Sequence, residues 1–310
     1  MSNPGNGARP RKWAVVINES AGAPLARETL ESTLHELLLG HGLEAEVHLV
    51  PGPEIEETIR EALDNGAEGI AAGGGDGTIS TAAGVLAHGT VPLGVLPLGT
   101  LNHFAKDLGI PLDLAGAVRV LAEGHLSRID LGEVNGHPFI NNSSIGGYPD
   151  VIRLREHHRR HFGRAKWTAH AIAFFRFLRR FRVLKVLLHL NDAGVIRKTP
   201  FVFVGNNEYL LDETLTATRR SLTGSCLCVY TARCDNGLQF LRLFGLLLAN
   251  RLADAPEFHA HCVEEVRVQT RHAHLHVSRD GEIFKMDMPL HYRILSQALP
   301  VFLPPPTPEA

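Results

Sequence analysis

Short apolar runs alternate with helical patterns between residues 12 and 123, and this alternation limits the possible folds more than any other feature. "KWAVVIN" at 12–18 is apolar and β-branched, as in a buried strand, whereas Leu30, Leu34 and Leu38 follow a helical spacing. Alternating strands and helices favour a parallel sheet covered on both faces. The predicted strands are 12–18, 43–50, 69–72 and 92–99, and the predicted helices are 24–40, 53–65, 78–88, 101–108 and 113–123.

Two glycine-bearing turns follow the last two of these strands. They are "GGGDGT" at 73–78 and "PLGT" at 97–100. Ligands bind beyond the carboxyl ends of parallel strands, and glycine lets backbone N–H groups approach a phosphate at a helix N-terminus. The alternative is a pair of tight turns without a ligand. Neither the P-loop spacing with its lysine nor the G-x-G-x-x-G pattern occurs here, which argues against those two classes.

The second half of the chain is rich in predicted strands. Turn dipeptides such as Asn135-Gly136 and Asp280-Gly281 separate many of them, which suggests a β-sandwich. One helix is expected at 236–250, with its leucines packed into the core. The predicted strands are 127–134, 137–146, 183–190, 199–205, 226–232, 263–270 and 272–278.

Several motifs in this chain resemble the diacylglycerol kinase catalytic-domain family, which includes bacterial lipid kinases and sphingosine kinases. "GGGDGT" is followed by "LPLGTLNHFAKDLGIP" at 96–111, and the second motif is the more specific, because NAD kinases share GGDGT. The resemblance continues in "RIDLGEVNGHPFINNSSIGG" at 128–147, "VGNNEY" at 204–209 and the segment 278–304. It therefore covers most of the chain.

The resemblance implies a two-domain lipid kinase that uses ATP and Mg²⁺ to phosphorylate a lipid hydroxyl. Residues 11–127 would form a nucleotide-binding α/β domain, to which the strand 298–304 returns. Residues 128–297 would form a β-rich lipid-substrate domain with a basic helical insertion at 151–185. The family's active site lies between its two domains.

The same resemblance assigns roles to individual residues. Glu282 and Asp76 are the catalytic candidates. Glu282 matches the proton acceptor of bacterial members and Asp76 matches the base of sphingosine-kinase-like members, so both remain open, with Glu282 preferred. Asn102 and Asp150 are candidates for substrate binding. The expected nucleotide-binding residues are Asn18, Gly73, Gly74, Gly75, Asp76, Gly77, Thr78, Gly99 and Thr100. Taken alone, "DGE" at 280–282 would indicate only a hairpin turn with exposed carboxylates.

Some segments depart from the family pattern. In "INESAG" at 17–22, Glu19 replaces a proline, and Val50 stands where a threonine is common. The segment "SLTGS" at 221–225 lacks the acidic residue that bacterial members link to a structural magnesium site. Because hydroxyls and carbonyls alone bind Mg²⁺ poorly, we assign no structural metal there.

Charge and composition bound the remaining possibilities. The net charge is −2, and no motif supports nucleic-acid binding. The segment 151–185 is rich in arginine and phenylalanine and could contact an anionic membrane or pack on the domain. No apolar stretch precedes the first strand, and no apolar stretch in the chain is long enough to span a bilayer. We therefore expect a cytoplasmic protein that associates peripherally with the membrane. A homodimer is compatible with the sequence.

The spacing of the cysteines and histidines does not match a known pattern of metal ligands. The chain has 4 cysteines, Cys226, Cys228, Cys234 and Cys262, too few for a disulfide framework and without a paired C-x-x-C, so we expect small buried side chains. His272, His274 and His276 alternate along one strand and have no evident carboxylate partner in the sequence. A solvated strand face is the expected explanation.

Two other functions stay open beside lipid phosphorylation. One is a soluble nucleotide kinase of the NAD kinase type, which shares GGDGT but does not need PLGTLNHFA. The other is a non-catalytic nucleotide or lipid sensor, suggested by the altered "INESAG" and "SLTGS" segments.

Overall fold

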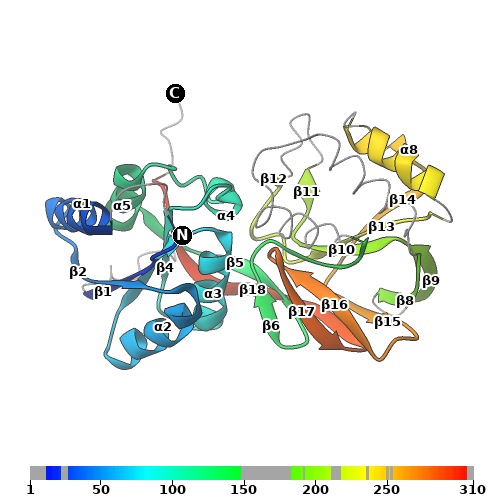
Figure 1. Cartoon of the computed structure of the whole chain (residues 1–310), viewed down its shortest axis with the longest axis horizontal. Helices are drawn as coiled ribbons and strands as arrows, with labels where there is room; N and C mark the ends of the chain where they lie inside the picture. Colours follow the sequence, from blue (N-terminus) through cyan, green and yellow to red (C-terminus); the bar gives the residue numbers. More distant parts are fainter. Residues whose placement is uncertain are drawn as a thin grey trace, which may run out of the picture. The chain divides into compact units, whose positions relative to one another are not determined.

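The computed structural model describes residues 12–21, 27–147, 183–190, 193–210, 218–234, 237–248, 251 and 254–305 (Figure 1). The chain divides into two compact units, one formed by 1–131 with 295–310 and the other by 132–294. The roles predicted above for the two parts of the chain remain predictions.

The first unit contains a parallel sheet. Its strands β1 (Lys12–Asn18), β2 (Glu44–Val50), β3 (Gly69–Gly74) and β4 (Leu93–Pro97) lie in the order β2-β1-β3-β4. β1 pairs in parallel with both β2 and β3, and β3 pairs in parallel with β4. Strands β3 and β4 are buried along their whole length, which explains their apolar sequences.

Helices cover this sheet because each buries one apolar side. In α2 (Ile55–Asp64) the buried residues Ile55, Ile59 and Ala62 recur at helical spacing. α1 packs beside α5 and α2 beside α3 (Figure 1). The other helical elements are α1 (Arg27–Gly40), η1 (Gly52–Glu54), α3 (Asp76–Leu86), α4 (His103–Asp107) and α5 (Leu114–Glu123).

The end of the chain adds a further strand to the first unit. In β18 (Leu290–Leu303), Val301 pairs in parallel with Leu93 of β4. The carboxylate of Asp130 in β5 (His125–Val134) accepts a hydrogen bond of 2.8 Å from the backbone N–H of Gln297, and Asp130 is fully buried. This contact holds the backbone of Gln297, whose φ is 50°.

The second unit contains antiparallel strands in two large groups and in the separate pair β11–β12. A six-stranded sheet has the order β14-β13-β10-β7-β16-β17. In the other group, β15 pairs with β8 and with the first residues of β18, β8 pairs with β9, and β5 pairs with β6. The strands are β6 (His137–Phe139), β7 (Asn142–Gly146), β8 (Leu184–Leu190), β9 (Ala193–Thr199), β10 (Phe201–Asn206), β11 (Tyr209–Leu210), β12 (Thr218–Arg219), β13 (Leu227–Ala232), β14 (Phe258–Val263), β15 (Glu265–Gln269), β16 (His274–Arg279) and β17 (Glu282–Asp287).

An apolar core lies between these two groups of strands. It joins Val186 and Val266 of one group to Ile145, Val204 and Val229 of the other. A smaller apolar cluster forms where α8 (Gly237–Leu248) packs through Leu243 against Ala232 and Cys234. The predicted fold class, an α/β unit followed by a β-rich sandwich, is confirmed.

Five strands in the second unit were not expected from the sequence, namely the short pair β11 and β12 and the strands β9, β14 and β17. β9, β14 and β17 mix strand-favouring residues such as Ile196 and Phe284 with glycine, histidine and charged residues, so they lack a continuous apolar run. Their formation depends on pairing with β8, β13 and β16 rather than on their own apolar pattern. The predicted strand 263–270 is likewise divided at Glu264 between β14 and β15.

Candidate functional site

The two glycine-bearing turns lie side by side at the carboxyl ends of β3 and β4. The backbone N–H of Leu98 donates to the carbonyl oxygen of Gly74 at 3.1 Å. A Cβ atom on Gly99 would fall against the Cα atom of Gly75 and 3.1 Å from its backbone nitrogen. The backbones of the two turns are therefore in direct contact, and a side chain at residue 99 would separate them.

Thr78, which ends the first turn, is hydrogen-bonded to Asn18 and packs closely against Gly74. Thr78 is buried, and its Oγ1 atom accepts a hydrogen bond of 3.2 Å from Nδ2 of Asn18 at the end of β1. A Cβ atom on Gly74 would lie 2.5 Å from the same Oγ1 atom, so glycine makes room for the threonine. Oδ1 of Asn18 accepts from the N–H of Ser20 at 3.0 Å. Three predicted site residues, Asn18, Gly74 and Thr78, are thus in one packed group.

Asp76 connects the two turns through its carboxylate. Its oxygens accept hydrogen bonds from the backbone N–H groups of His103 at 3.2 Å and Phe104 at 3.0 Å. These N–H groups belong to the first turn of α4, where they have no partner within the helix. The carboxylate therefore serves as the cap of α4, a contact that the sequence did not indicate.

Asn102 shapes the second turn from within. Nδ2 donates to the carbonyl oxygens of Pro97 at 3.2 Å and Gly99 at 2.9 Å, and Oδ1 accepts from the N–H of Gly99 at 3.0 Å. The residue is buried and has a φ of 50°, which asparagine tolerates better than most side chains. Both N–H donors of the amide are used inside the turn, while the neighbouring Thr100 is exposed.

The N-terminus of α3 supplies positive electrostatic potential to these turns. The helix begins at Asp76, its N-cap is Gly75, and no side chain caps it. The first backbone N–H groups of a helix have no intrahelical partner, and the helix dipole favours an anion near them. Backbone donors, two threonine hydroxyls and a helix N-terminus together suit a phosphate group.

The other predicted catalytic residue, Glu282, is in the second unit. It is exposed at the start of β17, directly after the two-residue turn Asp280-Gly281, whose φ angles are 48° and 90°. Two consecutive positive φ angles are typical of a type I′ hairpin turn. Within the described residues the carboxylate of Glu282 has no hydrogen bond or ion pair.

Asp280 fixes the turn that carries Glu282. Its carboxylate accepts from the backbone N–H groups of Ile140 at 2.9 Å, Asn141 at 2.8 Å and Asn142 at 3.1 Å. The carbonyl oxygen of Ile140 in turn accepts from Nη1 of the buried Arg219 at 2.6 Å and from Asn206 at 2.9 Å. Sequence reasoning missed Arg219 and Asn206 as parts of this network, although Asn206 lies in the "VGNNEY" motif.

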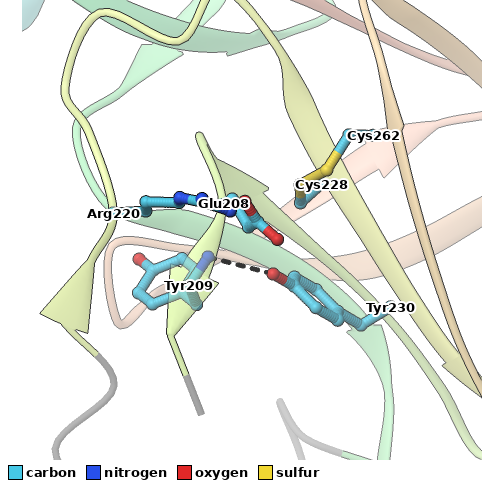
Figure 2. The surroundings of a disulfide bond; sticks show 6 residues. All are labelled: Glu208, Tyr209, Arg220, Cys228, Tyr230 and Cys262. Carbon is cyan, nitrogen blue, oxygen red and sulfur yellow. Dashed lines mark hydrogen bonds and ion pairs between the residues drawn. A yellow bond between two sulfur atoms is a disulfide. The ribbon is translucent and has the colours of Figure 1, made fainter. Parts of the chain in front are cut away.

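The cysteines differ from the sequence prediction. Cys228 and Cys262 form a disulfide between β13 and β14 (Figure 2). The two residues are direct partners in the antiparallel register, a relationship across 34 residues that spacing analysis does not reveal. Cys234 is buried as expected, and Cys226 is half-buried. Near the disulfide, the hydroxyl of Tyr230 accepts from the N–H of Tyr209 at 3.0 Å.

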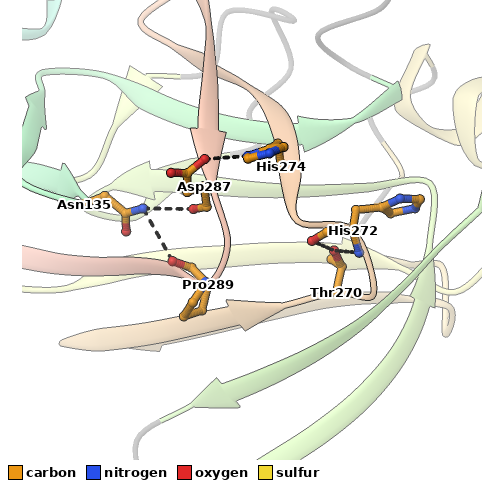
Figure 3. Close-up of polar contacts among 6 residues, drawn as sticks. All are labelled: Asn135, Thr270, His272, His274, Asp287 and Pro289. Carbon is orange, nitrogen blue, oxygen red and sulfur yellow. Dashed lines mark hydrogen bonds and ion pairs between the residues drawn. The ribbon is translucent and has the colours of Figure 1, made fainter.

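The three alternating histidines are exposed, as predicted. Nδ1 of His274 lies 2.5 Å from Oδ1 of Asp287, its direct partner across the β16–β17 pair (Figure 3). His272 is not part of a strand, and its N–H donates to Oγ1 of Thr270 at 3.1 Å. In the part of the chain that the structure describes, these histidines form no group of three metal-ligating side chains.

Other predicted features fall outside the described residues. These are Asp150 and nearly all of the basic segment, residues 151–182. None of the helices in the described part of the chain has both the length and the hydropathy of a membrane-spanning segment.

Comparison with known proteins identifies the family. Residues 12–134, which include both turns, match the sequence model of the diacylglycerol kinase catalytic domain. The match covers less than half of the chain, and this part is similar to the diacylglycerol kinase catalytic domain family. The match confirms the family resemblance read from the two turn motifs for this part of the chain, and a kinase family implies ATP as the nucleotide.

Curated relatives support the same family. A protein named diacylglycerol kinase from Staphylococcus saprophyticus is 30% identical over 145 residues, which cover 46% of this chain and 47% of the relative. A protein named probable lipid kinase YegS-like from Klebsiella pneumoniae is 34% identical over 142 residues, or 45% of this chain and 46% of the relative. The chain thus spans about half the length of the curated relatives it matches.

A solved structure shares the fold over nearly the whole chain. The crystal structure of a diacylglycerol kinase from Bacillus anthracis aligns with a TM-score of 0.70 and 17% identity. The alignment covers 96% of this chain and 99% of that protein. At this level of identity the likeness concerns the fold, including the second unit that lies beyond the family match.

Proposed function

We propose that this chain is an ATP-dependent lipid kinase that transfers the γ-phosphoryl group of ATP to a hydroxyl of diacylglycerol or a related lipid. One observation carries the proposal: two glycine-bearing turns contact each other at the carboxyl edge of a parallel sheet, in a segment that is similar to a diacylglycerol kinase family. A kinase of this kind must bind the phosphates of ATP, neutralise their charge and remove the proton of the acceptor hydroxyl.

Residues 73–78 and 97–100 would bind the phosphates. The uncapped start of α3 offers backbone donors, and the exposed hydroxyl of Thr100 offers another. Asn18 would act by holding Thr78 in place, because its Nδ2 atom already donates to that hydroxyl. Mg²⁺ would arrive with the nucleotide and neutralise phosphate charge.

Asp76 and Asn102 would mainly position the phosphate-binding backbone. Asp76 bonds to two N–H groups of α4, and Asn102 closes the turn around Gly99 with three hydrogen bonds. We therefore assign Asn102 to shaping the turn rather than to contacting the lipid. Asp150 remains the proposed contact to the lipid head group.

Glu282 would accept the proton of the lipid hydroxyl as the phosphoryl group is transferred. Its carboxylate is exposed, lacks a partner among the described residues and stands on a turn fixed by three hydrogen bonds to Asp280. A general base needs such a positioned carboxylate with its oxygens available. The base function thus falls to Glu282 rather than to Asp76, whose oxygens already serve α4.

A lipid kinase must reach its substrate in a bilayer. We propose that the basic segment 151–185 contacts the anionic surface of a membrane, because each cation near such a surface contributes about 1 kcal/mol. The protein would then act at the cytoplasmic face of the membrane as a peripheral enzyme.

The proposal is tested with the full chain, radiolabelled ATP and Mg²⁺, and vesicles of a total lipid extract, with NAD offered in parallel. We expect a labelled lipid. Glu282→Gln should lower kcat by roughly 10²–10⁴-fold, as for the loss of a general base, with unchanged ATP affinity. Asp287→Asn, on the same strand and also exposed, is the matched control and should retain activity.

Other outcomes identify the competing functions. Labelled NAD without labelled lipid would assign the chain to soluble nucleotide kinases. ATP binding with no labelled acceptor would make it a sensor, and near-normal activity of Glu282→Gln would remove that residue as the base.

A further inference from the structure

Three of the cysteines come together at one edge of the six-stranded sheet, and Figure 2 shows two of them, Cys228 and Cys262. The Sγ atoms of Cys226, Cys228 and Cys262 all lie within 4.8 Å of one another. Cys228 and Cys262 are joined as a disulfide, and Cys226 is outside it. A metal ion needs several ligand atoms close together. Among the described residues, these three cysteines are the group of cysteines, histidines or acids that meets this condition.

Strand pairing explains why these sulfur atoms converge. Cys228 and Cys262 are opposite each other in β13 and β14. Cys226 precedes the first residue of β13 by one position and is two residues from Cys228, so the two side chains can share one side of the extended chain. The remaining cysteine, Cys234, belongs to a separate apolar cluster with Leu243 and Ala255.

Exposure leaves the group open to reagents from solvent. Cys262 is exposed, Cys226 is half-buried and Cys228 is buried. A dithiol can therefore reach the outer sulfur of the disulfide. Two electrons and two protons pass from the dithiol to Cys228 and Cys262, which become thiols, and the dithiol becomes a cyclic disulfide.

We propose that, once the disulfide is reduced, Cys226, Cys228 and Cys262 form a three-thiolate binding site for a thiophilic d¹⁰ metal ion such as Zn²⁺. Binding releases one proton from each thiol and forms three metal–sulfur bonds, with the fourth position open to solvent beside Cys262. A zinc–sulfur bond of about 2.3 Å in a tetrahedron places the sulfur atoms about 3.8 Å apart. Here the three Sγ atoms lie within 4.8 Å of one another, so rotation of the cysteine side chains would bring them to that separation.

The two states of this three-cysteine site would perform the same structural task. β14 is an edge strand of the six-stranded sheet, and its cross-strand neighbour is β13. The disulfide ties the two strands in the oxidised protein. A metal bound by cysteines from both segments would tie them in the reduced protein.

The test uses the full chain reduced by a phosphine, which does not itself supply thiols, and titrated with Cd²⁺ as the probe. We expect one Cd²⁺ per chain, a cadmium–thiolate charge-transfer band and a higher melting temperature, because a ligand that binds the folded state stabilises it. Cys226→Ser should lose about a third of the band and weaken binding at least about 10-fold. Cys234→Ala is the matched control and should bind as the wild type does.

Two further arms keep the test decisive. Unreduced protein should show no band, and Cys262→Ser, which alters an exposed position, should weaken binding as Cys226→Ser does. Circular dichroism confirms that each variant is folded. The proposal is overturned if reduced wild type binds no stoichiometric Cd²⁺, if Cys226→Ser binds as wild type does, or if the oxidised protein gives the same band. None of these readouts depends on kinase activity.

Discussion

Gly99 shows at the scale of one residue how a missing side chain permits the candidate phosphate site. An added Cβ atom would press on the backbone of Gly75 and lie 2.8 Å from Oδ1 of Asn102. Gly75 and Asn102 are both held by hydrogen bonds, so neither can move away without breaking them. The close approach of the two turns therefore depends on glycine at this position.

We expect Gly99→Ala to reduce stability by about 1–3 kcal/mol, as overpacking does, and to weaken ATP binding. The matched control is Gly84→Ala, because Gly84 lies within α3 and a Cβ atom there meets nothing within 4 Å. Gly84→Ala should be neutral or about 0.5–1 kcal/mol more stable. Calorimetric titration with ATP and thermal unfolding check both variants, and equal ATP affinities would show that the turn contact is unimportant.

The β16–β17 hairpin shows at the scale of an element how one carboxylate can organise distant backbone. Three consecutive N–H groups, from Ile140 to Asn142, converge on Asp280 across nearly 140 residues of sequence. Removal of a shared acceptor leaves each of these partly buried donors without its partner. The pairing of β16 with β7 would remain, so the loss should be felt in the turn at 280–281 and in the segment 140–142.

We expect Asp280→Ala to destabilise the protein by about 2–4 kcal/mol. Asp287→Ala, at the other end of the same hairpin, removes only an exposed contact with His274 and should cost no more than about 1 kcal/mol. Urea unfolding of both variants measures the difference. If the two losses are equal, the three hydrogen bonds to Asp280 are not important for stability.

Buried tyrosines should make the stability of the whole molecule depend on alkaline pH. Burial raises the pKa of Tyr292, and a hydrogen bond with Ser143 opposes this shift only in part. Burial also raises the pKa of Tyr230. Since the folded state keeps these protons more tightly than the unfolded chain, their contribution is complete below the unfolded pKa of about 10 and is lost as the pH rises above it.

We therefore expect the free energy of unfolding to fall above about pH 10. Tyr292→Phe should be less stable at neutral pH, because the Oγ atom of Ser143 loses a partner at 3.2 Å. Its stability should nevertheless decline less steeply in alkali than that of the wild type. Unfolding measured across this pH range checks the slopes, and parallel curves would exclude Tyr292 as a cause.

The parts of the fold that could be predicted are those that local sequence determines. Strands β1, β3 and β4 are buried apolar runs, and the glycine turns after β3 and β4 have a recognisable composition. Contacts between distant segments could not be predicted in this way. The bonds of Asp76 to α4, the anchoring of Asp280 and the Cys228–Cys262 disulfide all depend on strand order and register.

β18 comes from the end of the chain but pairs with β4 of the first sheet. This pairing matters if residues 12–134, the segment that matches the family, are expressed alone. A fragment that stops at residue 134, where the family match ends, would lack the strand beside β4 and leave that edge open to pairing with other molecules. Such a fragment would tend to aggregate. The 2.8 Å bond between Asp130 and Gln297 suggests a better design, in which a short flexible linker joins residue 131 to residue 295.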